Sequence, residues 1–523
     1  MPRQPLRISC GLILLALLSC SVLAGRESRN LCPISEESLR HPQLPPGARE
    51  IVIAQKKKAW ERALGGEEAA RPYIRARLTG WPERLLVNRQ TLPESDEEFA
   101  WRVARDTWRG LTALTDRENG LPVDNVRFPA PSAEHGSDRP PADADSQIGD
   151  YASSSNIGLH LISIVAAHEL HFVPQAQAVE KIRRVLDTLD HLETYRGFFF
   201  NFYDTTSLER TSNFVSFVDS AWLTAGLMVV RMTFPELSEH CTQLIARANY
   251  GFFYNRGSRL MSHGYYVKQR ARSPFEYGML YTEARLGSLI AIGKGEVPAD
   301  NWFQMVRTFP VACTWQTLTP QAMRIKTVND HEFSAGFYEW NGVRYVPSWG
   351  GSMFEALMPA LLLDEPRYAP RSLGANDRAH AVVQRRHALE NLGYQVWGMS
   401  PSATPTGNGY AEYGVKVLGA RGYDAGAVTP YASALALAVT PEAALANLRT
   451  LAASYDIYGE YGFYDAVDPR SRTVAYTYLA LDQSMLFIAM ANYLNDHCIQ
   501  KRFASDPIGQ KVLPTIADED FFD

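Results

Sequence analysis

The sequence predicts an all-α protein with an (α/α)6 toroid, a barrel of helical hairpins that has aromatic rim loops and a small β-hairpin. Three observations support this fold. Apolar residues recur at spacings of three and four over long stretches. Nearly all-apolar helices alternate with amphipathic ones. A Gly-Phe-aromatic tripeptide begins at positions 197, 251, 336 and 462, and these gaps hold about six hairpins of roughly 40 to 50 residues each.

Two helical hairpins follow directly from these patterns. Residues 156–173 are almost wholly apolar, and residues 178–192 carry a single apolar stripe. Residues 217–234 and 237–250 repeat this arrangement, and a proline separates the members of each pair. Because a helix that is apolar all round must be covered on both sides, the first member of each pair is expected to be the inner one. Residues 336–348 predict the β-hairpin, with an Asn-Gly turn between aromatic residues.

Composition divides the chain into five segments. We expect a signal peptide at 1–24, a proline-rich tether at 25–50, a helical extension packed on the barrel at 51–116, the (α/α)6 catalytic domain at 117–500 and a C-terminal tail at 501–523.

The first residues predict export. Arg3 and Arg7 precede an apolar core of secretory length, and small residues follow it. Two processing sites compete: a lipobox that ends in Cys20, with a lipid anchor there, and ordinary cleavage after Ala24. The protein is therefore expected in the periplasm, as a membrane-anchored lipoprotein or as a secreted protein. Disulfides are permitted in such a compartment, and the pairing of the remaining cysteines stays open.

Composition and motifs exclude several function classes. The net charge of -5 comes without long blocks of like charge, which argues against a nucleic-acid partner. The chain has no phosphate-binding GxxxxGK[ST] loop, no GxSxG serine elbow and no HExxH or other metal-ligand spacing, so no metal and no cofactor are expected. Aromatic residues make up 11% of the chain, and their flat faces suit sugar rings. We expect a monomer with a carbohydrate substrate.

Acidic residues beside aromatic residues and glycines are the candidates for catalysis. Asp204 and Asp465 each follow an aromatic turn. Glu276 and Glu283 are seven residues apart, which would place them on one face of a single helix. Glu276 lies among aromatic residues, where partial desolvation would raise its pKa toward that of a general acid. The structural alternative for these acids is helix capping.

The expected substrate-binding set combines acids with aromatic rings near the same turns. Its members are Glu355, Glu412, Tyr203, Trp349, Trp397, Tyr410, Phe463 and Tyr464. Asp482, in a predicted helix at 475–494, could also face the lumen, or it could serve as a structural hydrogen-bonding group.

Eight ordered segments between about residues 119 and 494 carry a family resemblance. Among them are the stretches 120–125, 155–159, 353–359 and 428–433. In these stretches the sequence resembles the glycoamylase-like proteins related to glycoside hydrolase family 144, the endo-β-1,2-glucanases, and to the glycoamylase-like segment of cyclic β-1,2-glucan synthases. The resemblance implies an (α/α)6 toroid that binds glucan, with Asp204, Glu276 and Asp465 as its carboxylates. The chain departs from the synthase-like pattern at Pro401 and at 481–484, which leaves the glucan linkage open.

The resulting hypothesis is an exported glycoside hydrolase that cleaves a β-glucan, most plausibly β-1,2-linked, by two-carboxylate inverting catalysis. Glu276 would donate the proton, and Asp465 or Asp204 would activate water. Two alternatives remain open. A glycan-binding lipoprotein would need only stacking surfaces such as Trp222, Trp302, Trp349 and Trp397. A polysaccharide lyase would use the cluster formed by 263–266, Arg270 and Arg272 on an acidic substrate.

Overall fold

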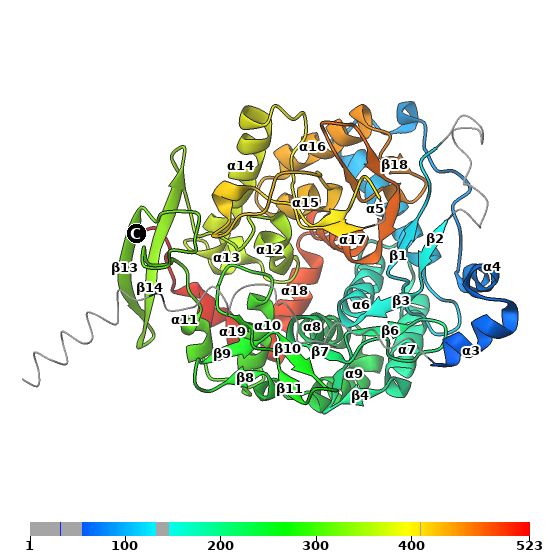
Figure 1. The fold of residues 1–523 in the computed structure, drawn as a ribbon, viewed down its shortest axis with the longest axis horizontal. Coiled ribbons are helices and arrows are strands. Elements are labelled where there is room, and N and C mark those ends of the chain that lie inside the picture. Colours follow the sequence, from blue (N-terminus) through cyan, green and yellow to red (C-terminus); the bar gives the residue numbers. More distant parts are fainter. Residues whose placement is uncertain (1–31, 33–54, 132–145, 408) are drawn as a thin grey trace, which may run out of the picture.

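The computed structural model describes residue 32 and residues 55–131, 146–407 and 409–523 (Figure 1). The expected signal peptide, the Cys20 lipobox and all of the tether except Cys32 lie outside the described residues. Within the described residues, no helix is long and apolar enough to cross a membrane.

Six largely buried helices of the described chain form the inner layer. They are α6 (Ser154–Glu169), α8 (Phe217–Thr233), α10 (Arg285–Gly293), α12 (Met353–Leu357), α15 (Pro430–Leu435) and α17 (Ala480–Leu494). Helix α6 packs on α8, α8 on α10, α12 on α15, α15 on α17 and α17 back on α6, so the series returns to its first helix (Figure 1). Helices α10 and α12 are joined through the Arg285 side chain.

Each inner helix packs against a helix of an outer layer. These outer helices are α7 (Gln175–His191), α9 (Pro235–Arg247), α19 (Pro507–Ala517), α14 (Leu373–Arg386), α16 (Pro441–Ser454) and α5 (Asp96–Ala113), in the order of their inner partners. The hairpins α6–α7 and α8–α9 confirm the two predicted pairs and their order. Helix α17 begins at Ala480, five residues later than expected, because residues 474–475 and 477–479 form strands.

Both ends of the chain contribute to the outer layer. Helix α5, from the expected N-terminal extension, packs on α17, and α19 packs on α10. The segment 501–523, expected as a C-terminal tail, thus holds helix α19 of the outer layer. Glu519 anchors that segment by accepting hydrogen bonds from the Trp302 indole (2.6 Å) and from the buried Arg307 guanidinium (2.6 and 3.1 Å).

The remaining helices lie around this body. They are α3 (Gln55–Leu64), α4 (Glu67–Arg77), α11 (Asp300–Gln304), α13 (Glu365–Tyr368) and α18 (Cys498–Ser505). Helix α18 packs against α6, α8 and α17. Cys32 and Cys313 form a disulfide, and the other two cysteines of the described chain, Cys241 and Cys498, are buried thiols.

The expectation of an all-α protein with one small β-hairpin understates the strand content, because the described chain holds nine small antiparallel sheets. Seven of them are formed by β1 (Asn125–Arg127), β2 (Gln147–Gly149) and β22 (Thr477–Leu479); β3 (Tyr151–Ser153) and β6 (Phe202–Asp204); β4 (Thr194–Tyr195) and β5 (Phe198–Phe199); β7 (Phe214–Ser216), β10 (Gly264–Tyr266) and β11 (Ala271–Arg272); β16 (Ser402–Ala403) and β17 (Tyr410–Ala411); β18 (Tyr458–Gly459) and β19 (Gly462–Phe463); and β20 (Ala466–Val467) and β21 (Val474–Ala475).

The other two sheets test specific predictions. Strands β8 (Tyr254–Asn255), β9 (Leu260–Ser262) and β12 (Glu276–Tyr277) form one of them, which places Glu276 on a strand. The other consists of β13 (Ala322–Val328), β14 (His331–Trp340) and β15 (Val343–Tyr345). It confirms the predicted hairpin: Asn341 and Gly342 have φ values of 47° and 79°, as an Asn-Gly turn between twisted strands requires.

The contact between α6 and α8 depends on Gly158. A Cβ atom at this position would lie 2.4 Å from the Trp222 carbonyl oxygen. We expect Gly158→Ala to lower the free energy of unfolding by about 1–3 kcal/mol, because neither helix backbone can yield without loss of packing. Urea denaturation measures this, with Gly257→Ala in an exposed loop as the control. Equal stability of the two variants would contradict the tight packing.

Candidate functional site

The first turns of the inner helices meet through polar side chains. At the start of α6, the Ser155 hydroxyl donates to Asp219 of α8 (2.7 Å), and the neighbouring Asn156 amide donates to Asp124 (2.8 Å). Burial raises the pKa of both aspartates. Ser155 and Asn156 are neighbours in α6 and bind different acids. The N-terminal end of α6 therefore lies close both to the N-terminal end of α8, which carries Asp219, and to the segment before β1, which carries Asp124.

The same end of the molecule joins α10, α12 and α15. Arg285, the first residue of α10, donates to the carbonyl oxygens of Glu355 (3.2 Å) and Ala356 (2.6 Å) in α12. The Ser400 hydroxyl accepts from the Phe354 amide (2.9 Å) and from the Tyr431 hydroxyl of α15 (2.8 Å). The N-terminal ends of the inner helices therefore converge, and they bring their positive dipole ends together.

Carboxyl groups gather where these helix ends meet. We call the following set the acid cluster: Asp124, Asp219, Glu283, Glu355, Glu412, Asp465 and Asp482. Among the described residues, no group of three or more His, Cys, Asp or Glu side chains is arranged to hold a metal ion. Carboxyl groups at such a place can transfer protons and bind hydroxyl groups.

Glu283 combines burial with access to solvent. It precedes α10 by two residues and is half-buried. Burial and the neighbouring Glu355 carboxylate raise the pKa of Glu283 to about 7. A carboxyl group that keeps its proton near neutral pH can donate that proton to a leaving group.

Asp465 and Asp482 form a second acidic unit. The Ala403 amide donates to Asp465 (2.6 Å), and burial raises the pKa of Asp465 to about 6. Burial and the Asp465 charge hold the pKa of Asp482 well above its usual range. Among the described residues, both carboxylate oxygens of Asp482 and Oδ1 of Asp465 are buried without a hydrogen-bonding partner, and each acid influences the pKa of the other. The two groups therefore bind one proton between them more readily than either would alone.

Two tyrosines and Glu412 are electrostatically coupled to the two acidic units. Tyr410 is 51% exposed, and the charges of Asp482 and Asp465 act on its hydroxyl group. Tyr423 hydrogen-bonds Glu412, and its pKa is raised by burial and by the charges of Glu355, Glu412 and Glu283. Tyr410 and Tyr423 thus connect the two acidic units, and Tyr410 and Glu412 are open to solvent.

Two of the three predicted catalytic carboxylates lie elsewhere. Glu276 does not share a helix with Glu283, because it belongs to strand β12 and helix α10 begins only at Arg285. Its carboxylate accepts from the Asn255 amide of strand β8 (2.6 Å) and from the Ser258 hydroxyl of the turn that follows (2.8 Å). Asp204 is 1% exposed and accepts from the Ser207 amide (2.6 Å) and from Lys57 (2.8 Å), so it stabilises a turn. Asp465 alone lies in the acid cluster.

The predicted substrate-binding residues also divide into two groups. Four aromatic residues of that set are buried in the core and are 0–2% exposed, which keeps them from contacting a ligand: Tyr203, Trp397, Phe463 and Tyr464. Tyr410, Glu412 and Trp349 are open to solvent, and the Trp349 ring lies 5.8 Å from that of Trp315. Glu355 forms the capping box of α12 with Ser352, so it fixes the helix start.

Sequence reasoning did not select Glu283, Asp482, Asp124 or Asp219 as catalytic or binding residues. Each of them precedes an inner helix or a short strand or lies in the first turn of a helix. The usable signal is an acid at or just before the start of several nearly all-apolar helices, as in α8, α10 and α17, and not the aromatic neighbours of Glu276.

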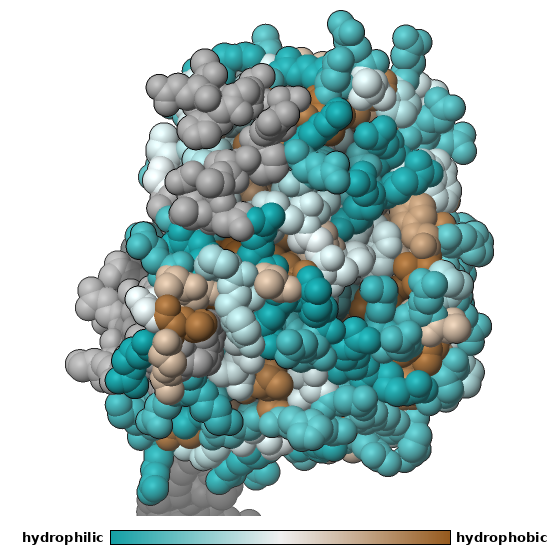
Figure 2. All heavy atoms as spheres, turned by 90° about the vertical axis from the view of Figure 1, so that its right-hand side faces the viewer, coloured by the Kyte–Doolittle hydropathy of each residue, from teal (hydrophilic) through white to brown (hydrophobic). Residues whose placement is uncertain are grey.

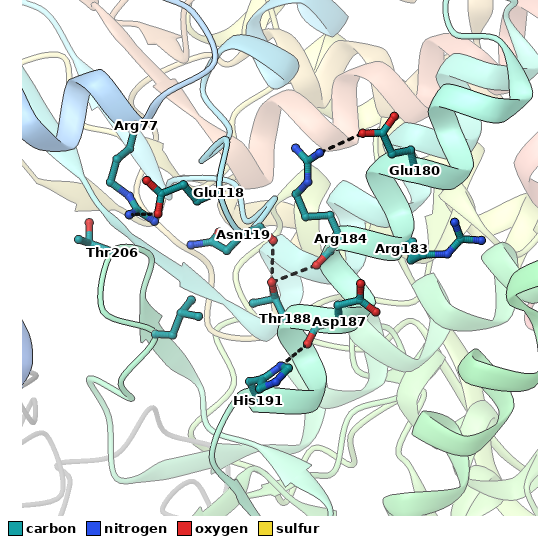
Figure 3. Close-up of a pocket in the computed structure, with 11 residues that line it drawn as sticks. Arg77, Glu118, Asn119, Glu180, Arg183, Arg184, Asp187, Thr188, His191 and Thr206 are labelled. Carbon is teal, nitrogen blue, oxygen red and sulfur yellow. Dashed lines mark hydrogen bonds and ion pairs between the residues drawn. The ribbon is translucent and has the colours of Figure 1, made fainter.

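A cavity of about 560 Å³ lies outside the acid cluster, against the outer helix α7 and the end of α4 (Figure 3). Arg77 pairs with Glu118 (2.6 Å) and Arg184 pairs with Glu180 (3.1 Å) at its wall. The described residues that line it include no Phe, Tyr or Trp, and cationic and anionic side chains alternate around it. It therefore lacks the flat apolar surfaces on which sugar rings stack.

Glu283 makes a prediction about stability. Burial gives its folded form a pKa of about 7 against the usual 4.5, so the folded protein holds this proton more tightly than the unfolded chain does. The raised pKa of Glu283 therefore contributes about 2–3 kcal/mol to the free energy of unfolding. This contribution is fully present below about pH 4.5 and is lost as the pH rises through 7. Glu283→Gln should therefore melt at a higher temperature than the unmutated protein at pH 8, with little difference at pH 4. Glu239→Gln, on the exposed side of α9, is the control, and equal melting temperatures at pH 8 would contradict the buried charge.

Comparisons with known proteins give the relationship. Residues 313–507 match the Glycoamylase family model, described as a glucoamylase family, and residues 102–289 match DUF3131, a family of unknown function. The chain is 24% identical, over 82% of its length, to the cyclic β-(1,2)-glucan synthase NdvB of Rhizobium meliloti, and it spans only 18% of that synthase.

Solved structures share the fold. An endo-β-1,2-glucanase from Chitinophaga pinensis, in complex with sophorotriose and glucose, matches 81% of this chain and 99% of its own, with 18% identity and a TM-score of 0.60. A β-1,2-glucanase from Parabacteroides distasonis matches 82% of this chain and 61% of its own, with 17% identity and a TM-score of 0.63. An endo-β-1,2-glucanase from Talaromyces funiculosus, in complex with sophorose, matches 82% and 91%, with 12% identity and a TM-score of 0.60. The family matches, the synthase and the shared fold together show that this chain is related to the glycoamylase-like proteins.

Proposed function

We propose that the protein is a glycoside hydrolase that cleaves a neutral β-glucan, β-1,2-linked foremost, at the acid cluster of an (α/α)6 toroid. The observation that carries the proposal is the presence of two acidic units with different proton affinities at the convergent helix ends. Hydrolysis of a glycosidic bond needs one protonated carboxyl group and one ionised one. The relatives that act on β-1,2-glucan support the choice of substrate.

We assign the two roles to different residues. Glu283, with a pKa of about 7, donates the proton to the leaving oxygen. The Asp465–Asp482 pair, once it has lost a proton, activates the water molecule that attacks the anomeric carbon, so the proposed reaction inverts the configuration. Glu412 and Tyr410 bind sugar hydroxyl groups from the solvent side.

The alternative of a non-catalytic binding protein is less well supported. Trp222, Trp302 and Trp397 would be its stacking surfaces, but all three are 1–2% exposed. Trp349 remains the accessible member of that predicted set. The lyase alternative depended on residues 263–266 together with Arg270 and Arg272, and both arginine residues are exposed.

We also propose export to an oxidising compartment. The Cys32–Cys313 disulfide supports this, because such bonds persist in the periplasm and outside the cell and are rare in a reducing cytosol. The lipid anchor at Cys20 belongs to the same proposal, and labelling with a radioactive fatty acid would test it.

Turnover of β-1,2-glucan by substituted proteins tests the assignment. The unmutated protein should release oligosaccharides, and both Glu283→Gln and Asp465→Asn should lower kcat by about 10²- to 10⁴-fold, because each removes one proton-transfer group. Glu276→Gln, a carboxylate outside the acid cluster, should stay within about twofold of the unmutated rate. Product chromatography on a panel of neutral β-glucans measures all four proteins. Full activity of Glu283→Gln would refute its role, and loss of activity in Glu276→Gln alone would restore the sequence-based assignment.

The pH dependence of kcat/KM should be a narrow bell. Activity rises as the aspartate pair loses a proton, near the Asp465 pKa of about 6, and it falls as Glu283 loses its proton near pH 7. In Glu283→Gln the falling limb near pH 7 should disappear from the residual activity. A limb that stays in that variant would show that another group carries the proton.

A further inference from the structure

A lysine side chain joins helix α3 to two acids of the body of the protein. The Lys57 ammonium group lies 2.5 Å from the Asp150 carboxylate and 2.8 Å from that of Asp204. The side chains of Lys57, Asp150 and Asp204 are 17%, 9% and 2% exposed. Lys57 therefore places one positive charge between two acids that are largely removed from water.

A second polar contact joins α3 to the same part of the body. The Lys56 backbone amide donates to Glu209 (3.1 Å). The described side chains of α3 are half-buried or exposed, and Leu64 is 47% exposed. Helices α3 and α4 lie at the edge of the molecule in Figure 1, and the face around them in Figure 2 is mostly hydrophilic. The ion pairs of Lys57 thus join a peripheral helix to two buried acids of the body.

Asp150 is next to the residues that support the acid cluster. The Asp124 amide donates to the carbonyl oxygens of both neighbours of Asp150, namely Gly149 (2.9 Å) and Tyr151 (2.8 Å). Thr205 holds Asp150 from the other side, because its amide (2.9 Å) and hydroxyl (3.0 Å) both donate to the Asp150 carbonyl. A shift of residue 150 would therefore move the backbone on which Asp124 depends.

The side chain of Asp124 depends on the same backbone. Asn125 donates to the Asp124 carboxylate (2.9 Å), and the Asn125 amide lies so close to Gly149 that a Cβ atom there would be 2.5 Å from it. Because Gly149 has no side chain, the Asn125 amide can lie against the backbone of residue 149 and donate to Asp124. Lys57 is thus connected to the acid cluster in two polar contacts. Its ammonium group binds the Asp150 side chain, and the backbone on both sides of Asp150 binds the Asp124 amide.

We propose that α3 acts as a clamp and that Lys57 is a positioning residue for Asp124, in a site whose proposed function as a glycosidase this inference takes as given. Without the lysine, Asp150 and Asp204 would be two neighbouring buried carboxylates with no counter-charge between them, and the 149–151 turn would shift to let water reach them. The acid cluster would then lose the placement of Asp124 although Lys57 touches no substrate.

The test compares Lys57→Met with Lys56→Met, a change to an exposed neighbour on the same helix, and with Lys57→Arg, which keeps the charge. Lys57→Met should lower kcat on β-1,2-glucan by about 10- to 100-fold per folded molecule, because displaced supporting groups cost that much in aligned sites. KM should change less than kcat. Lys56→Met should keep full activity, and Lys57→Arg should restore part of the loss.

Hydrogen–deuterium exchange supplies a readout that needs no substrate. Peptides that cover 147–153 and 122–127 should exchange at least tenfold faster in Lys57→Met than in Lys56→Met. Unchanged exchange and unchanged kcat would overturn the clamp, and so would a lower melting temperature with kcat per folded molecule intact. If the unmutated protein hydrolyses no glucan, the proposed function fails, and the exchange rates still decide whether α3 holds the turn beside Asp124.

Discussion

The convergence of the inner helix N-termini is the constraint on which the rest of the structure depends. Each helix start offers backbone N–H groups without partners in its own helix and a partial positive charge. Carboxylates are the natural partners of such ends, but seven of them in one place repel one another and lose water. The hydrogen-bond donors around each carboxylate decide how far burial raises its pKa. Glu355 accepts from Ser348, Gly350 and Ser352, which offsets its burial. Asp482 has Asp465 beside it, and its pKa lies well above the usual range.

Arg285 shows how the fold offsets this concentration of negative charge. Its guanidinium group is 0% exposed and binds both oxygens of Glu365 at 2.8 and 2.7 Å, with Asp377 at 3.7 Å. It also donates to two carbonyl oxygens of α12, so it ties the start of α10 to the next inner helix. Glu283 lies only two residues before Arg285, so this anchoring holds the start of α10 beside the segment that carries the proposed proton donor. Removal of one partner would leave a buried charge uncompensated.

The sequence allowed prediction of what is local. The α6–α7 and α8–α9 hairpins follow from apolar spacing and a proline break, and the 331–345 hairpin follows from its Asn-Gly turn. The site was less predictable, because the aromatic neighbours of Glu276 are equally compatible with a strand, and its partner Asn255 is 21 residues away. The role of residues 507–517 was missed for the same reason: a short amphipathic helix does not reveal that it covers α10, more than 200 residues earlier in the chain.

These tertiary contacts explain why the acid cluster needs nearly the whole described chain. Helix α5 covers α17 from the N-terminal side, and α19 covers α10 from the C-terminal side, so the inner series is enclosed only when both ends are in place. Asp124 lies directly before β1, which pairs with β2 on one side and with β22, the strand before α17, on the other. Asp124 and Asp482 can therefore meet only after residues some 350 positions apart have paired. The proton affinities of the cluster are then properties of the closed fold, since burial is the largest cause of the raised pKa of Glu283, Asp465 and Asp482 alike.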